Sequence, residues 1–342
     1  MDIIPLSGFN NIDLRSEKEF QKGTIPNSVN IPILLNAEFE KVGKEYKNNG
    51  KAAAISLGYR LVKSDLREKR ISLWKKHIIN NPDCNIFCYK GGLRSEIALE
   101  WLEAENFKIK KLSGGYKKFR SVIIKEHLDI NNYKKNWVII GGLTGSGKTT
   151  LINKSNQKID LEKIANHRGS AFGKNNTTQP SQANFENMLT IKYLNHQYSN
   201  IVLEDESRTI GKAALPGFWY EKMQISKLVV LKISTDQRIK NILEEYVIRE
   251  LNIPNNSHKL LKRYLTALEK IKKRLGLVSF KEISGLMINA FNNNNINLHE
   301  DWIIKLLTKY YDPMYNYKLE SRKKYIVHIG DDISCLEYLK SI

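Results

Sequence analysis

Two glycine-rich segments of this chain each combine anion-binding groups with a reactive side chain. They are residues 88–95, with the sequence CYKGGLRS, and residues 142–149, with the sequence GLTGSGKT. The first places a thiol at the mouth of a cradle of backbone N–H groups, and the second places an ammonium and a hydroxyl group where a diphosphate would lie. Together they predict a carrier of a chalcogen or phosphoryl group joined to a diphosphate-binding module.

The cysteine segment has the features of a thiolate site. Cys88 lies where an apolar run gives way to a predicted helix, so the helix dipole and free amides would stabilise its thiolate. Lys90 and Arg94 add positive charge, while Gly91 and Gly92 let successive N–H groups turn inward. Five residues separate Cys88 from Arg94, as in cysteine phosphatases, which predicts a wider cradle than many rhodaneses have. The structural alternative is a buried cysteine beside a glycine turn.

The second segment fits the pattern G-x-x-x-x-G-K-[ST] between a predicted strand and a predicted helix, which indicates a phosphate-binding loop. Amides beside Gly142, Gly145 and Gly147 would cradle phosphate oxygens, and Lys148 would neutralise their charge. The hydroxyl group of Thr149 is a candidate ligand of Mg²⁺.

Two polar segments should reach the same edge of the sheet as this loop. An acidic segment, Glu204-Asp205-Glu206, comes at the far end of a predicted strand, where a metal-binding or water-positioning carboxylate would lie, and Asp205 is the preferred residue. Arg168 would bind a diphosphate through bidentate hydrogen bonds from its guanidinium. His167 would transfer a proton or contact a base. The alternatives are a solvated acidic turn and a structural histidine.

A formal net charge of +19 dominates the composition of this chain of 342 residues. Such an excess is larger than solubility requires and predicts attraction to a polyanion, with nucleic acid the expected one; a drift toward Lys, Asn and Ile is the alternative. Three cysteines, Cys84, Cys88 and Cys335, cannot form a disulfide framework and fit a reducing cytoplasm. The sequence shows neither a signal peptide pattern nor a membrane-spanning apolar run, so we expect a cytoplasmic protein without a membrane partner.

The spacing of apolar residues predicts an α/β protein of two domains. Residues 1–128 alternate apolar runs with helical patterns, which is typical of βα units around a mostly parallel sheet. Residues 129–136 form the predicted linker, and residues 137–342 form a predicted P-loop NTPase-like domain with a parallel sheet. Within it, residues 236–318 are expected to form a basic helical insertion. Strands are expected at residues 11–14, 85–87, 109–112, 137–140, 158–161, 201–204, 228–233 and 325–329.

Residues up to about 120 resemble a rhodanese domain, through residues 13–16, residues 25–32 and the Cys88 loop. Over nearly its whole length the chain is similar to the bacterial tRNA 2-selenouridine synthase family, in which a rhodanese domain precedes a P-loop domain. It departs from that family at Tyr89-Lys90, where the family usually has Trp-Arg. The matching motifs outside the two loops are residues 42–43, 46–47, 57–58, 114–117, 166–173, 179–182, 185–186 and 204–208.

The resemblance implies a two-stage enzyme that acts on the wobble uridine of the tRNAs for Lys, Glu and Gln. Geranyl diphosphate would first alkylate the sulfur of 2-thiouridine, and selenium from selenophosphate would then displace the geranylthio group. The phosphate loop would hold the leaving diphosphate, and Cys88 would carry selenium. No tightly bound cofactor is implied, and a role for Mg²⁺ at Thr149 and Asp205 is left open.

The implied partners are tRNA and the enzyme that makes selenophosphate, and DNA is not expected. The basic insertion would bind tRNA phosphates, although a solvated helix face is the alternative for each single cation. The cations assigned to tRNA are Lys270, Lys272, Lys273 and Arg274.

Two other classes of protein compete with this interpretation. The first is a cysteine phosphatase, arsenate reductase-like or sulfurtransferase domain fused to a nucleotide-binding, kinase-like domain, because Cys88 and Arg94 have the phosphatase spacing. Phe87 argues against a phosphatase, since a histidine usually precedes the cysteine there. The second is a non-catalytic regulator that senses nucleotides and binds RNA. The presence of both Cys88 and Lys148 argues against a non-catalytic role.

Overall fold

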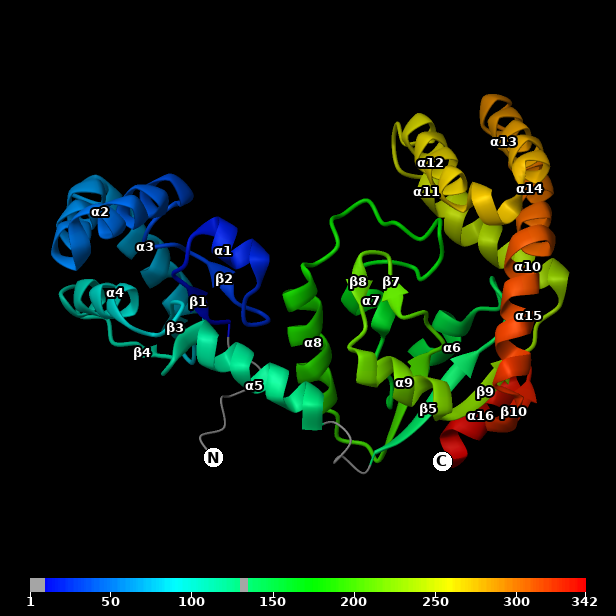
Figure 1. Ribbon diagram of the computed structural model, residues 1–342, viewed down its shortest axis with the longest axis horizontal. Helices are drawn as coiled ribbons and strands as arrows, with labels where there is room; N and C mark the ends of the chain where they lie inside the picture. The colour runs from blue at the N-terminus through cyan, green and yellow to red at the C-terminus, as the bar shows by residue number, and fades with distance from the viewer. Residues whose placement is uncertain (1–9, 130–134) are drawn as a thin grey trace. The chain divides into compact units, whose positions relative to one another are not determined.

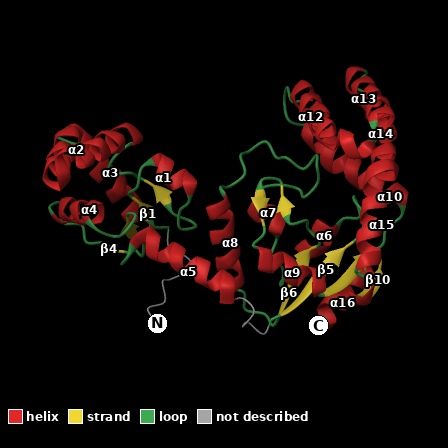
Figure 2. Ribbon diagram, viewed as in Figure 1, coloured by secondary structure: helices red, strands yellow, loops and turns green. Residues whose placement is uncertain are grey.

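The computed structural model describes residues 10–129 and 135–342, and the chain groups into two compact units (Figure 1). The first unit comprises Met1–Asn132 and Pro180–Asn195, and the second comprises Tyr133–Gln179 and His196–Ile342. Each unit has a parallel sheet with helices, so the predicted α/β class is confirmed (Figure 2). Most of the predicted linker, residues 130–134, lies outside the described residues.

The first unit has a four-stranded parallel sheet in the order β2-β1-β3-β4. The strands are short: the predicted strand at residues 85–87 is confirmed, those at 11–14 and 109–112 are two residues long, and the strand at residues 29–30 was not predicted. They are β1 (Ile12–Asp13), β2 (Val29–Asn30), β3 (Asn85–Phe87) and β4 (Lys110–Lys111). Gly50, with φ of 83°, breaks α2 into two helical segments. The helices are α1 (Glu17–Lys22), α2 (Asn36–Leu61), α3 (Asp65–Asn80), α4 (Leu93–Glu103), α5 (Gly115–Asp129) and α8 (Gln182–Leu194).

Helix α8 belongs to the first unit although the chain reaches it after the phosphate loop. Asn187 of α8 is fully buried; it donates a hydrogen bond to the carbonyl of Thr24 at 2.8 Å and accepts one from Arg120 of α5 at 2.8 Å. Asn184 accepts a bond from the amide of Thr24 at 2.8 Å. This grouping differs from the expected domain of residues 137–342, because polar side chains, which carry no periodic signal, hold the helix in place.

The second unit has a parallel sheet in the order β10-β9-β5-β6. The predicted strand at residues 158–161 is wrong: Lys158 makes one isolated parallel bridge to Val202, and the side chain of Asp160 then caps the next helix. The strands are β5 (Asn136–Gly141), β6 (Asn200–Glu204), β9 (Lys227–Leu231) and β10 (Ile326–Gly330), with a small hairpin of β7 (Thr209–Ile210) and β8 (Ala213–Ala214).

The helices of this unit include a large insertion between β9 and β10. The insertion has its own core, centred on the buried rings of Tyr264, Phe291 and Trp302. Outside the insertion lie α6 (Lys148–Asn153), α7 (Leu161–Ala165), α9 (Gly217–Ile225), η5 (Lys323–Tyr325) and α16 (Asp332–Ser341). The insertion comprises α10 (Thr235–Ile242), η2 (Leu243–Ile248), α11 (Arg249–Leu251), α12 (Ser257–Leu275), α13 (Leu277–Asn292), η3 (Ile296–Leu298), α14 (His299–Leu306), η4 (Leu307–Tyr311) and α15 (Asp312–Ser321).

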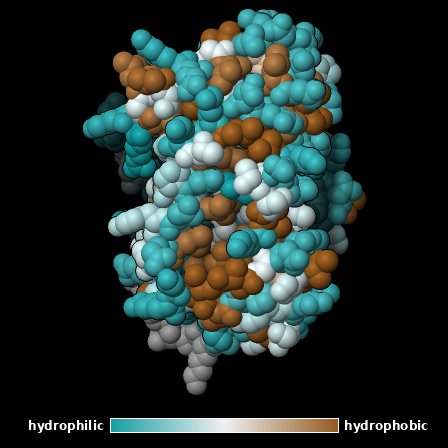
Figure 3. All heavy atoms as spheres, turned by 90° about the vertical axis from the view of Figure 1, so that its right-hand side faces the viewer, coloured by the Kyte–Doolittle hydropathy of each residue, from teal (hydrophilic) through white to brown (hydrophobic). Residues whose placement is uncertain are grey.

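Strand β10 lies at the edge of its sheet and keeps much of its surface in solvent. Val327, Ile329 and Ile333 are exposed apolar residues of this edge and the following helix, and apolar surface is visible on this side of the second unit (Figure 3). Among the described residues, no helix combines the length and the apolar character that crossing a membrane would require.

Replacing Asn187 by Ala should lower the free energy of unfolding of the first unit by about 1–3 kcal/mol, because the Thr24 carbonyl and Arg120 both lose a buried partner. Urea denaturation measures this change, and hydrogen exchange localises it to α5 and α8. Lys192→Ala, at an exposed position of the same helix, is the control. Equal unfolding midpoints for the two variants would contradict the anchoring role of Asn187.

Candidate active site

The cysteine loop connects β3 to α4 within the first unit. Cys88 is only 4% exposed, and its thiol lies 3.9 Å from the carbonyl oxygen of Gly92, the residue that precedes the helix. The amides of Ser95 and Glu96 bond back to Gly92 and close the first turn of α4. Ser95 has a buried hydroxyl oxygen without a partner among the described residues. The sulfur therefore lies beside the start of helix α4.

A second glycine turn supports the cysteine loop from behind. The amides of Tyr116 and Lys117 bond to the carbonyls of Cys88 at 3.0 Å and Tyr89 at 2.8 Å. Gly115 has φ of 55°, and a Cβ there would collide with the carbonyl oxygen of Cys88 and approach the amide nitrogen of Gly91 to 2.7 Å. The turn can lie this close only because position 115 has no side chain.

The two cations of the cysteine loop differ in their surroundings. Arg94 forms a two-point ion pair with Glu19 at 2.7 and 3.1 Å, and its guanidinium lies 5.0 Å from the ring centre of Phe39. Glu19 also closes the capping box of α1 with Ser16, so one carboxylate fixes both a helix start and Arg94. Lys90 is exposed. The loop thus has one fixed and one solvated positive charge.

The phosphate loop runs from β5 to α6 in the second unit. The ammonium of Lys148 donates to the carbonyls of Gly142 at 3.0 Å and Leu143 at 3.2 Å, and lies 5.4 Å from the ring centre of Tyr315. Desolvation lowers the pKa of Lys148, and the neighbouring carboxylates of Glu206 and Glu204 oppose that change. A diphosphate would replace the loop carbonyls as the partner of this ammonium.

Helix α10 supports the phosphate loop. Arg238, which is 2% exposed, donates to the carbonyl of Thr144 at 2.8 Å and pairs with Asp312 at 2.5 Å. Asn241 donates to the carbonyl of Gly145 at 2.9 Å. Because these loop carbonyls are bound from outside, the loop amides stay directed at the site. The insertion therefore holds the phosphate loop in place.

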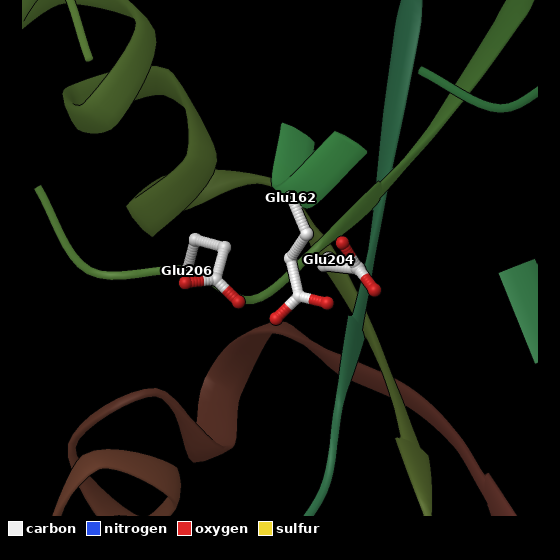
Figure 4. Close-up of side chains that lie close together, drawn as sticks. All are labelled: Glu162, Glu204 and Glu206. Atoms are coloured by element: carbon white, nitrogen blue, oxygen red, sulfur yellow. The ribbon is translucent and has the colours of Figure 1, made fainter. Parts of the chain in front are cut away.

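Three carboxylates converge beside the phosphate loop, and they come from Glu162, Glu204 and Glu206 (Figure 4). Each offers one oxygen, and these oxygens lie within 4.8 Å of one another. Thr149 donates to Glu162 at 3.2 Å. Burial, followed by repulsion from the other carboxylates, raises the pKa of Glu162 to about 10 and that of Glu204 to about 8. Such a cluster favours either bound protons or a cation.

The residue preferred from the sequence, Asp205, has a different environment. Its carboxylate pairs with Arg322 at 2.5 Å and with Lys318 at 3.0 Å, and it is almost fully buried. Since two cations already neutralise it, Asp205 is the wrong member of the acidic segment for a metal site. The side chains of Glu204 and Glu206 lie at the site instead.

The residues present fit Mg²⁺, the metal that a phosphate loop ordinarily uses. Three carboxylates and the Thr149 hydroxyl group form a donor set of oxygens alone, which Mg²⁺ prefers. Both oxygens of Glu204 are buried without a hydrogen-bond partner among the residues described. A Cβ at Gly169 would lie 2.5 Å from Glu206 and 2.6 Å from Glu162, so the missing side chain keeps this space open.

The segment at residues 166–173 passes over this cluster, but its polar side chains point to other partners. Arg168 pairs with Glu250 at 2.8 Å and lies 5.2 Å from the ring centre of Tyr246, so its diphosphate contact stays a prediction. His167 is buried, and burial, with the charges of Lys270 and Arg168, lowers its pKa. A neutral imidazole is therefore favoured, which suits hydrogen bonding to a base.

The basic insertion has a cationic groove, a hollow of about 350 Å³ along one side of α12. Of the cations assigned to tRNA from the sequence, Lys270 lines this groove, and Lys273 and Arg274 are exposed nearby. Lys272 instead pairs with Glu269 at 2.9 Å and lies over the ring of Phe280. The cations that line the groove are Lys174, Lys259, Lys262, Arg263 and Lys270.

Sequence reasoning missed Glu162 and Arg238. Glu162 had a usable signal, since it follows the segment at Lys158 that pairs with β6 and therefore reaches the edge where Glu204 lies. Arg238 had none, because an arginine on an amphipathic helix is ordinarily a surface residue. Only packing reveals that it binds the phosphate loop.

Comparison with known proteins covers both units. The family model described as tRNA 2-selenouridine synthase AAA domain matches residues 135–342, and the model of the rhodanese-like domain matches residues 6–122. The chain is 39% identical to the tRNA 2-selenouridine synthase of Shewanella denitrificans over 97% of this chain and 94% of the relative. It is 40% identical to that of Shewanella frigidimarina, over 94% of this chain and 91% of the relative.

Mg²⁺ should raise the melting temperature of the second unit, because it neutralises three clustered carboxylates, two of them buried. At 100 times its dissociation constant the gain is about 2.7 kcal/mol, or about 5–10 °C for a domain of this size. Scanning calorimetry with Mg²⁺ and with a chelator measures the shift. Glu204→Gln should remove most of it, whereas Glu337→Gln, at an exposed position of α16, should keep it. The metal assignment fails if the Glu204 variant responds like the unmodified protein.

Proposed function

The chain belongs to the tRNA 2-selenouridine synthase family, and we propose that it converts wobble 2-thiouridine in tRNA to 2-selenouridine through a geranylated intermediate. The observation that carries the proposal is the pairing of a thiol-bearing anion loop at Cys88 with a phosphate loop at Lys148, in two compact units of one chain. The test is mass spectrometry of nucleosides after incubation of 2-thiouridine tRNA with geranyl diphosphate and selenophosphate.

The first stage is assigned to the second unit. The uridine sulfur attacks the first carbon of geranyl diphosphate; a carbon–sulfur bond forms, the carbon–oxygen bond breaks, diphosphate leaves, and the base loses its N3 proton. Lys148 and a cation held by Glu162, Glu204 and Glu206 would stabilise the leaving diphosphate. Neither the formation of the carbon–sulfur bond nor the departure of diphosphate needs nucleotide hydrolysis.

A narrow apolar pocket of about 30 Å³ lies beside the phosphate loop, and a prenyl chain would enter it only if the surrounding side chains move apart. Its walls are mostly rings and aliphatic chains, with Thr144 and Ser170 the polar residues of the lining. The rings that line the pocket are those of Phe172, Tyr246, Tyr264, Trp302 and Tyr311.

The second stage is assigned to the first unit. Selenium from selenophosphate attacks C2 of the geranylated base, and the carbon–sulfur bond breaks. The prenyl thiolate leaves and takes a proton, and water cleaves the phosphorus–selenium bond to release phosphate, so no oxidant is consumed. The cradle before α4 would bind the phosphoryl oxygens of selenophosphate. Cys88 would hold the selenium atom during its transfer to the base.

The tRNA substrate is supported by charge. The groove along α12 gathers lysines in a chain with a net charge of +19, which suits a sugar–phosphate backbone. We further propose tRNAs for Lys, Glu and Gln as the acceptors, and the enzyme that produces selenophosphate as a functional partner.

Variants of the two loops should separate the two stages. Cys88→Ser should accumulate geranylated tRNA without selenouridine, because the phosphate loop lies in the other unit. Lys148→Ala should slow geranylation by about 100-fold or more, since one fixed cation at the leaving group is lost. The same Lys148 variant should still selenate tRNA that is already geranylated. Loss of both products in Cys88→Ser, or a requirement for ATP, would overturn this division.

Neutralising Lys259, Lys262 and Lys270 together should flatten the slope of log affinity for tRNA against log salt by about 2 units. Cognate and non-cognate tRNAs should weaken alike, because phosphate contacts carry no sequence information. Salt titrations by filter binding measure the slope. The control is a triple variant with the same charge change at exposed positions away from the groove, namely Lys227, Lys232 and Lys340. Equal slopes for both triple variants would show that the groove is ordinary solvated surface and does not bind tRNA phosphates.

A further inference from the structure

An apolar cavity of about 550 Å³ lies beside the cysteine loop in the first unit. The loop itself supplies part of the wall through Lys90, Leu93 and Arg94, so the cavity adjoins the segment that carries Cys88. The volume falls within the range of small-molecule sites. Neither the fold of the sheet nor the chemistry at the thiol requires a space of this size there.

The break in α2 builds the opposite wall. Gly50 ends the first helical segment of α2, and the second segment folds back beside it (Figure 1). A Cβ at Gly58 would lie 4.0 Å from the side chain of Val42. Val42, Tyr46 and Gly58 line the cavity, and they come from three motifs that carry the family resemblance yet have no part in either loop. These motifs therefore shape the cavity.

The cavity is apolar inside and aromatic at its entrance. Trp101 is 5% exposed and lies 6.4 Å from the ring centre of Tyr59, whereas Tyr59 and Leu93 are both more than 40% exposed. Apolar side chains kept in solvent around a hollow mark a binding site for apolar groups. Lys51 and Lys90 are exposed positive charges of the same lining, which suits a ligand attached to a polyanion.

We propose that this cavity binds the prenyl chain of the S-prenylated tRNA intermediate and presents its sulfur-bearing base to the cysteine loop. The proposal rests on the proposed function, because only the second stage has a substrate that combines a branched hydrocarbon with an RNA backbone. The prenyl thiolate that leaves when the C2–sulfur bond breaks stays in the cavity and takes up a proton. A nucleobase fits less well, since these walls offer its polar edge few partners.

Filling the cavity tests the proposal. Gly58→Leu adds a side chain at a helical position where the Cβ itself meets only Val42, at 4.0 Å, and Leu also favours a helix more than Gly does. Gly43→Leu is the matched control, because position 43 lies on the same helix, has no atom within 4 Å of an added Cβ and does not line the cavity. The substrates are an anticodon stem-loop with S-geranyl-2-thiouridine and one with S-methyl-2-thiouridine, each with selenophosphate.

Gly58→Leu should raise the KM for the S-geranyl stem-loop by about 10-fold or more, since each buried methylene is worth about 4-fold. The KM for the S-methyl stem-loop should change by less than about 2-fold, and Gly43→Leu should match the unmodified protein on both substrates. An unchanged KM for the S-geranyl substrate, or an equal loss on both substrates, would overturn the proposal.

Binding measurements separate this proposal from the proposed function. If the unmodified protein does not selenate either stem-loop, the proposed second stage fails. Fluorescence anisotropy then tests the role of the cavity. The unmodified protein should bind the S-geranyl stem-loop more tightly than the S-methyl one, and Gly58→Leu should abolish that preference. If the preference survives in Gly58→Leu, the prenyl chain binds outside this cavity and the proposal is wrong.

Discussion

The structure of the second unit depends on keeping three acidic side chains close together beside one lysine. Glu162, Glu204 and Glu206 offer oxygens within 4.8 Å of one another, and burial raises the pKa of all three. Like charges in such a space repel strongly, so the cluster persists only where protons or cations compensate. Lys148 supplies one compensating charge, and a divalent ion would supply more.

The surrounding ion pairs show how that arrangement is held. Arg322 and Lys318 neutralise Asp205, so the middle residue of the acidic segment fixes the segment to the insertion while its two neighbours face the site. Arg238 ties the phosphate loop to α10 and to Asp312. The insertion is therefore part of the site, because its Arg238 and Lys318 orient the phosphate loop and the acidic segment at residues 204–206.

The first unit solves a related problem with fewer charges. Cys88 lies at a helix start, Glu19 fixes Arg94, and Gly115 lets a second turn pack against the loop. The apolar cavity beside this loop gives the unit a property that a small anionic selenium donor alone would not need. A polar reaction centre next to an apolar space suits a substrate that is hydrocarbon at one end and charged at the other.

The sequence by itself determined the two loops, the α/β class and the basic helical insertion, because each depends on local spacing: glycines between a strand and a helix, or apolar residues at helical intervals. Only the tertiary structure decided that Glu162 joins Glu204, that Asp205 is neutralised, and that α8 belongs to the first unit. These outcomes depend on contacts between side chains from distant parts of the sequence. Neither the spacing nor the composition of the sequence indicates which carboxylate pairs with an arginine.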